Sequence, residues 1–212
     1  MGFTVKEIFY TLQGEGFYAG RPAVFCRFSG CNLWSGREAD RETAQCRFCD
    51  TDFLGTSPSG GKFEDAKALA HAVRSFFPTF QHPGYRPYVV FTGGEPALQV
   101  TAELVQELKR YGVELGIETN GTLALPDGLD WITVSPKART VQVVTSGNEL
   151  KFVWPQKDFS LSELERLNFE HFYLQPLDCK DQPGLMQQVV NICLKHPLWK
   201  LSLQTHKFIG IP

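Results

Sequence analysis

The sequence predicts an α/β fold in which mainly parallel strands form an incomplete barrel, with fewer helices than a complete eightfold barrel needs. Three observations predict it. Short β-rich runs alternate with segments of helical periodicity, several of the runs are apolar on both faces as buried parallel strands are, and polar clusters follow the strand ends. At 212 residues, 42% of them hydrophobic, the chain is long enough for one sizeable core and shows no linker or repeat. We therefore expect residues 1–212 to form a single domain.

Eight segments are predicted as strands because they are rich in β-branched and aromatic residues: 5–10, 23–29, 88–92, 113–118, 131–135, 149–154, 171–175 and 200–205. Helical periodicity is clearest in residues 64–77 and returns at 104–111, where Gly112 ends it. Ser160 and Glu163 form a capping box for a third helix, and Pro183 suits the first turn of a last helix that continues to Leu194. Residues 55–62, rich in Gly and Ser, are predicted as a loop.

The charge balance argues for a small-molecule substrate. Lys and Arg number 21 against 23 Asp and Glu, so no broad positive surface is expected for nucleic acid or an anionic membrane. No apolar run reaches the length of a membrane span, and Lys6 and Glu7 interrupt the beginning of the chain where a signal peptide would be continuously hydrophobic. We expect a cytoplasmic protein without a membrane or nucleic-acid partner.

Three cysteines lie close together in the first fifty residues: Cys31, then fourteen residues, then Cys46 and Cys49 with two residues between them. Three thiolates are one short of a structural zinc site or of a closed iron-sulfur cluster. A [4Fe-4S] cluster held by three cysteines leaves one iron open. A ligand with an amino and a carboxylate group, such as S-adenosylmethionine (SAM), can chelate that iron.

A four-cysteine zinc site completed by Cys26 is the alternative. Alternation in the strand at 23–29 places Val24, Cys26 and Phe28 on one face. Cys26 is therefore expected to pack as a small core residue, whereas Cys31 follows the strand's end and can reach a site. The spacing alone leaves zinc open, and disulfides are less favoured because no secretion signal accompanies the cysteines.

Polar clusters follow four of the predicted strands, at 92–96, 118–121, 135–137 and 175–178. The carboxyl ends of parallel strands meet at one rim, which is where active sites form in such barrels. Paired glycines before Glu95 allow the backbone to approach a ligand closely, and the Glu95 carboxylate can accept hydrogen bonds from an ammonium group. Glu118 can hold ribose hydroxyls, as an acidic residue does in dinucleotide sites.

The cysteine set and the Gly-Gly-Glu-Pro segment at 93–96 resemble the radical SAM superfamily, and the whole chain resembles its 7-carboxy-7-deazaguanine synthases. The commonest motif of the superfamily has three residues between its first two cysteines. Fourteen residues here resemble a branch of the deazaguanine synthases with an enlarged cluster loop, at 31–51. Residues 10–16, 49–51 and 204–207 match as well.

The resemblance implies a partial TIM-like barrel of the radical SAM type and a lyase that acts on 6-carboxy-5,6,7,8-tetrahydropterin. A reduced cluster cleaves SAM, the 5′-deoxyadenosyl radical abstracts hydrogen from C6, and ring contraction with loss of ammonia gives 7-carboxy-7-deazaguanine, for queuosine in tRNA or another deazapurine. SAM is regenerated. The resemblance further implies a [4Fe-4S] cluster, SAM and Mg²⁺ as cofactors, a homodimer, and an electron donor such as flavodoxin or ferredoxin.

Site residues carry over by matching positions. The cluster ligands would be Cys31, Cys46 and Cys49, and Thr51 would bind Mg²⁺. The SAM-binding positions would be Phe48, Cys49, Asp50, Gly94, Glu95, Glu118, Ser135, Pro136, Lys137, Gln175, Pro176, Leu177 and Asp178. The substrate-binding positions would be Leu12, Gln13, Gly14, Glu15, Arg27, Thr92, His206 and, through its carboxylate, Pro212.

Two other interpretations remain. A small activase that installs a glycyl radical on a partner enzyme shares the cluster and the Gly-Gly segment, but the long cluster loop, residues 12–15 and residues 205–207 argue against it. A non-catalytic zinc-binding module is the more distant alternative.

Overall fold

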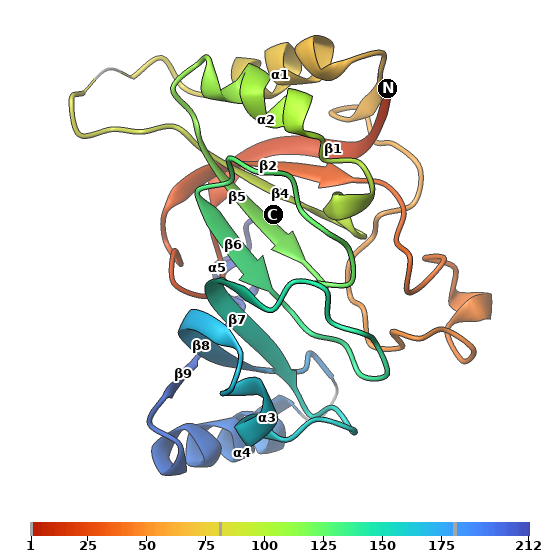
Figure 1. The fold of residues 1–212 in the computed structure, drawn as a ribbon, viewed down its shortest axis with the longest axis vertical. Helices are drawn as coiled ribbons and strands as arrows, with labels where there is room; N and C mark the ends of the chain where they lie inside the picture. The colour runs from red at the N-terminus through yellow and green to blue at the C-terminus, as the bar shows by residue number, and fades with distance from the viewer. Residues whose placement is uncertain (1, 81, 180–181) are drawn as a thin grey trace.

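The computed structural model describes residues 2–80, 82–179 and 182–212 and contains a nine-stranded sheet in the order β3-β1-β2-β4-β5-β6-β7-β8-β9 (Figure 1). Every neighbouring pair from β2 to β9 is parallel, while β1 pairs antiparallel with both β2 and β3. In the described part of the chain, β3 and β9 stand at opposite ends of the sheet, which stays open. The predicted incomplete barrel of mainly parallel strands is confirmed.

The strands are β1 (Phe3–Leu12), β2 (Pro22–Phe28), β3 (Gly61–Phe63), β4 (Tyr88–Gly93), β5 (Glu114–Thr119), β6 (Trp131–Val134), β7 (Ser146–Trp154), β8 (Asn168–Pro176) and β9 (Trp199–Leu201). The helices are α1 (Ala66–Ser75), α2 (Ala102–Lys109), α3 (Leu161–Leu164), α4 (Gln182–Lys195) and α5 (Thr205–Ile209), with short 3-10 helices η1 (Glu38–Asp40) and η2 (Pro96–Leu98). All eight predicted strands and all four predicted helices are present.

β7 and β8 begin three residues earlier than predicted, at Ser146 and Asn168, and two segments are wrong in kind. The last strand was expected over 200–205, but β9 ends at Leu201 and Thr205 begins α5. The N–H and hydroxyl of Thr205 both donate to the carbonyl oxygen of Gly14, at 2.9 and 2.8 Å, which draws the chain away from the sheet. Residues 61 and 62, expected in a loop, belong to β3 because this segment pairs with the beginning of β1.

Helices α1 to α4 cover one face of the sheet and pack on its two larger cores, whereas α5 lies at the pocket on the other face. In Figure 1, α1 and α2 lie over β1, β2, β4 and β5, whereas α3 and α4 lie beside β7, β8 and β9. Side-chain oxygens cap the first pair of helices: Asp65 accepts from the N–H of Ala68 at 2.8 Å, and Thr101 accepts from the N–H of Leu104 at 3.2 Å. Cys26 is fully buried in the first core, as the alternation in its strand predicts.

The opposite face of the sheet carries a small apolar cluster of Ala23, Phe25, Tyr88 and Val90, and beside it the polar side chains of the strands. Because side chains alternate along a strand, Phe25 and Arg27 of β2, and Glu149 and Lys151 of β7, point away from the helix-covered cores. The loop after β1 folds over this face, where the N–H of Gly16 donates to Ser202 Oγ at 3.1 Å. The fold therefore presents one concave polar surface, whose rim is formed by the carboxyl ends of the parallel strands.

Candidate active site

A pocket of about 470 Å³ lies on this face. It is lined by the loop after β1, by the strand ends from β4 to β8, by the second half of the cluster loop and by the segment around α5. All but four of the site residues predicted from sequence line it: Leu12, Gln13, Gly14, Glu15, Arg27, Cys46, Phe48, Cys49, Asp50, Thr51, Thr92, Glu118, Ser135, Lys137, Gln175, Pro176, Leu177, Asp178, His206 and Pro212. The four that do not line it are Cys31, Gly94, Glu95 and Pro136.

The cluster loop is braced from within. The guanidinium of Arg41 lies 4.1 Å above the ring of Trp34, and its Nη1 donates to the carbonyl oxygens of Arg47 and Cys49, both at 3.0 Å. The N–H of Cys46 donates to the carbonyl oxygen of Leu33 at 3.2 Å. Hydrogen bonds to a cationic side chain are stronger than neutral ones, so Arg41 fixes the backbone around Cys46 and Cys49.

The three cysteines supply, from one loop, the thiol ligands that an iron-sulfur cluster takes. Burial raises the pKa of both Cys31 and Cys49, and nearby negative charges raise it further: those of Glu95 and Cys49 for Cys31, and those of Cys46 and Asp50 for Cys49. A bound cationic metal centre reverses this penalty and deprotonates the thiols. The N–H of Leu33 points at Cys31 Sγ, at 3.4 Å, and can stabilise such a thiolate.

Cys26 is not placed as a fourth ligand. Its side chain is fully buried in the first core, and burial raises the pKa of its thiol. Within residues 2–80, 82–179 and 182–212, no three His, Cys, Asp or Glu side chains converge as ligands of a single metal ion. The thiol ligands available for a cluster are therefore the three cysteines of the cluster loop, of which Cys46 and Cys49 line the pocket.

Gly94 and Glu95 lie beneath the pocket wall. A Cβ at Gly94 would come within 2.0 Å of the carbonyl oxygen of Gly30 and 2.9 Å of the Cβ of Cys31, so only glycine allows this approach to the cluster loop. Glu95 is fully buried, and its carboxylate accepts from Thr119 Oγ1 and from the N–H of Asn120, both at 2.7 Å. Burial raises the pKa of Glu95, and these hydrogen bonds offset part of the rise.

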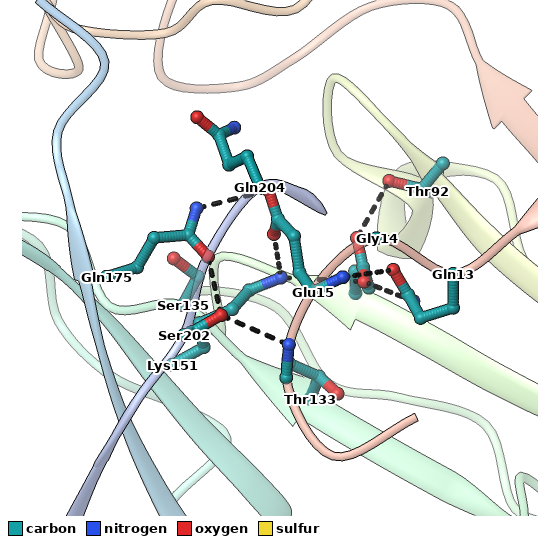
Figure 2. Close-up of polar contacts among 12 residues, drawn as sticks. Gln13, Gly14, Glu15, Thr92, Thr133, Ser135, Lys151, Gln175, Ser202 and Gln204 are labelled. Carbon is teal, nitrogen blue, oxygen red and sulfur yellow. Dashed lines mark hydrogen bonds and ion pairs between the residues drawn. The ribbon is translucent and has the colours of Figure 1, made fainter. Parts of the chain in front are cut away.

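A second polar group lies deeper in the pocket (Figure 2), where Gln13, Glu15, Lys151 and Gln175 converge. Gln175 Nε2 donates to Glu15 Oε1 at 3.1 Å, and the N–H of Glu15 donates to Gln13 Oε1 at 3.1 Å. Lys151 Nζ donates to the other carboxylate oxygen of Glu15. Burial alone would raise the pKa of Glu15, but the Lys151 ammonium outweighs it and the pKa is lowered.

The segment around α5 closes one side of the pocket. Lys207 Nζ forms ion pairs with Asp50 at 2.7 Å and with Asp178 at 2.5 Å, which ties α5 to the cluster loop and to the end of β8. Burial alone would raise the pKa of Asp50, and the hydrogen bond from Lys207 outweighs it and lowers that pKa. A Cβ at Gly14 would come within 2.1 Å of the His206 ring, so the loop after β1 and α5 are in direct contact.

The sequence analysis missed several polar residues of this pocket, among them Lys151, Thr133, Gln204 and Lys207. For Lys151 a pattern was present in the sequence. Glu149 and Lys151 alternate with Leu150 and Phe152 in a strand expected at the centre of a parallel sheet, where charged residues are rare unless paired. Gln204 and Lys207 lie in the segment 204–207 that matches the family, but only His206 of that segment is predicted there as a site residue.

The site and fold together define a radical SAM enzyme: an open α/β barrel with three cysteines and a polar pocket at the carboxyl ends of its strands.

Comparison with known proteins shows which family within this class the chain resembles. No family model matches the chain. It is 57% identical over 216 residues to the 7-carboxy-7-deazaguanine synthase of Nitratidesulfovibrio vulgaris and 56% identical over 213 residues to that of Bordetella pertussis, covering 100% of both chains in each pair. The crystal structure of QueE from Escherichia coli superposes with a TM-score of 0.71 at 27% identity, covering 97% of this chain and 95% of that one.

The chain belongs to the 7-carboxy-7-deazaguanine synthase family. This membership implies a [4Fe-4S] cluster and SAM as cofactors, as the cysteine set suggested. None of the helices in the described ranges is long and apolar enough to cross a membrane.

Proposed function

We propose that the protein is the lyase that converts 6-carboxy-5,6,7,8-tetrahydropterin to 7-carboxy-7-deazaguanine with loss of ammonia. The single observation that carries this proposal is full-length identity above 50% to several proteins of that name. When bound, the cluster and SAM supply hydrogen-atom abstraction from carbon; the protein contributes binding, orientation and exclusion of water.

Cys31, Cys46 and Cys49 are proposed to hold the cluster. The bracing by Arg41 supports this assignment, because it presets the backbone of the last two cysteines before any cluster binds. Lys137 lines the pocket with Cys46 and Cys49, and its Nζ lies 5.9 Å from the centre of the Phe48 ring. Burial lowers the pKa of Lys137, and negative charge on the two thiolates opposes this fall, so the ammonium and the thiolates stabilise each other.

SAM is proposed to lie between the cluster loop and the strand ends. Backbone near Phe48 and Asp50 would flank it on one side, with Ser135, Pro136, Lys137 and the run from Gln175 to Asp178 on the other. Glu118 at the end of β5 is aimed into the pocket, where its carboxylate can accept from ribose hydroxyls. Gly94 and Glu95 support this region from below, because Glu95 joins the loop after β4 to the loop after β5.

The pterin is proposed to bind next to the loop after β1. Leu12 and Gly14 offer backbone groups, Gln13 an amide and Glu15 a carboxylate to the edge of the heterocycle. The further proposed contacts are Thr92, His206 and the carboxylate of Pro212, which line the same pocket. His206 packs against Gly14 of this loop, and Thr11 Oγ1 donates to Pro212 at 3.1 Å.

Arg27 is proposed to bind the substrate carboxylate. It is paired with Glu7 at 2.8 Å through its Nε. Among the described residues this is the hydrogen bond that the guanidinium makes, so its terminal nitrogens remain for a carboxylate in the pocket.

Thr51 is proposed to bind Mg²⁺. It lies between Asp50, which is paired with Lys207, and Asp52, which is paired with Lys6 at 2.8 Å. Both carboxylates are therefore already neutralised, and the ion would be held by the Thr51 hydroxyl, substrate oxygens and water, as Mg²⁺ prefers. A homodimer, a flavodoxin- or ferredoxin-like electron donor and a cytoplasmic location, which suits thiolate ligands, complete the proposal.

Anaerobic turnover tests the function. The reconstituted protein is incubated with SAM, dithionite, Mg²⁺ and the carboxytetrahydropterin, and the products are analysed by mass spectrometry. We expect a product with the mass of 7-carboxy-7-deazaguanine. Cleavage of SAM without that product would support a radical SAM enzyme and exclude the carboxytetrahydropterin as its substrate. Activity only with a partner protein would favour an activase.

A further inference from the structure

Lys151 is a buried cation between two carboxylates from different sides of the pocket. Its side chain is 6% exposed, on β7, which is paired on both sides in the sheet. Its ammonium is paired with Glu15, from the loop after β1, and lies 3.5 Å from Glu118 Oε1, at the end of β5. Burial alone would lower the pKa of Lys151, but the nearby carboxylates outweigh it and raise it, so the ammonium stays charged.

The two carboxylates have different proposed ligands and share Gln13 as a hydrogen-bond partner. Glu15 accepts from Gln175, and its N–H donates to Gln13, on the proposed pterin side (Figure 2). Glu118, the proposed ribose contact, accepts from Gln13 Nε2 at 3.0 Å and from Thr92 Oγ1 at 3.4 Å. Gln13 joins the two sets by hydrogen bonds, and Lys151 is the charged group that lies beside both carboxylates.

The location of Lys151 on β7 makes it suitable for holding the two carboxylates in fixed positions. Its backbone is held in the sheet beside Tyr173 of β8, and strands position side chains more accurately than loops do. Without the ammonium, the negative charges of Glu15, Glu118 and Glu149 would face one another in a buried space and repel. Glu15, which lies on a loop, is the one free to move away.

We propose that Lys151 is a positioning residue for the reaction, which fixes the Glu15 carboxylate against the pterin at a set distance from Glu118 and thereby orients the substrate relative to SAM. This inference rests on the proposed function. Lys151 acts through Glu15, and its removal leaves a pocket that binds the pterin in a poorly aligned position.

The test compares Lys151→Met, Glu15→Gln and the double variant with the wild type, in anaerobically reconstituted protein. Lys200→Met, the same substitution at an exposed position on β9, is the control. Three quantities are measured: kcat for deazaguanine formation, the Kd of the pterin by calorimetry with SAM present and no reductant, and iron content as a check of the cluster.

We expect Lys151→Met to lower kcat roughly 100-fold, the scale of a small misplacement, while the Kd of the pterin changes by less than about tenfold. The double variant should be no slower than Glu15→Gln, because both substitutions remove the same interaction. A kcat within about threefold of wild type overturns the proposal. So do effects that multiply in the double variant, since Lys151 would then act on a ligand directly.

Should Lys151→Met fail to fold, the double variant still decides, because it removes one positive and one negative charge and leaves the net charge of the site unchanged. Its kcat is then compared with that of Glu15→Gln: equality supports the proposal, and a further roughly tenfold loss overturns it. A wild type that forms no deazaguanine refutes the proposed function and this inference with it. A wild type that turns over beside an equally active Lys151→Met variant refutes the inference alone.

Discussion

Glu149 offers a stability prediction that depends on pH. It lies on β7 with 3% of its surface exposed, and its Oε2 accepts from the N–H of Phe17 at 3.1 Å. Burial raises the pKa of Glu149 to about 7, with Lys151 and the Phe17 N–H opposing the rise. Glu149→Gln keeps the shape and the acceptor oxygen and removes the charge.

The sign of the effect follows from the two pKa values. In the unfolded chain the carboxyl titrates near 4.5, and in the folded protein at about 7. Because the folded value is higher, the stability that protonated Glu149 contributes is fully present below pH 4.5 and is lost as the pH rises through 7. Between pH 5 and pH 8 the wild type should lose about 2–3 kcal/mol that the Gln variant keeps.

Thermal unfolding measures this loss. For a chain of this size, each kcal/mol shifts the Tm by about 2–4 °C, so Glu149→Gln should melt roughly 5–10 °C higher relative to wild type at pH 8 than at pH 5. Glu64→Gln, at an exposed glutamate, should show the same difference from wild type at both pH values. A Tm difference between Glu149→Gln and wild type that does not change with pH would refute the reasoning, as would one of the opposite sign.

Three further predictions concern the cluster loop and its neighbours. Cys26→Ala should keep the full iron content and lower the free energy of unfolding by about 1 kcal/mol, because Cys26 is a core residue. Cys31→Ala should lose iron. Loss of iron from Cys26→Ala would contradict the core position of Cys26. Gly94→Ala should abolish SAM binding in calorimetry, because its Cβ would lie 2.0 Å from the carbonyl oxygen of Gly30; normal affinity would show that the two loops can separate. Thr51→Ala should keep the cluster spectrum and reduce the stimulation of turnover by Mg²⁺, and an unchanged Mg²⁺ response would remove the role of Thr51.

Much of the fold could be predicted because most of the strands have a recognisable local sequence pattern. In β4, Val89, Val90 and Phe91 follow one another as a short apolar run, and the amphipathic pattern of α1 needs no tertiary information. The parts that were missed depend on partners far away in the chain. β3 is a strand only because β1 passes beside it, and α5 begins at Thr205 because Gly14 accepts its hydrogen bonds.

The candidate site divides in the same way. Cys46, Cys49 and Glu118 could be found from spacing and strand ends, since their chemistry is visible in short motifs. The ion pairs of Lys151 with Glu15 and of Lys207 with Asp50 could not, because each of these two pairs joins residues more than a hundred positions apart. The alternation in β7 indicates that Lys151 is buried and needs a partner, but only the folded chain shows which carboxylates lie beside it.

Transfer of a label from substrate to SAM tests the central claim most directly, because it requires the cluster residues and the pterin residues to serve one pocket. The wild-type protein is supplied with carboxytetrahydropterin deuterated at C6, and SAM is isolated after turnover. The account predicts deuterium in the recovered SAM together with 7-carboxy-7-deazaguanine. Deazaguanine formed while the recovered SAM carries no deuterium would contradict it.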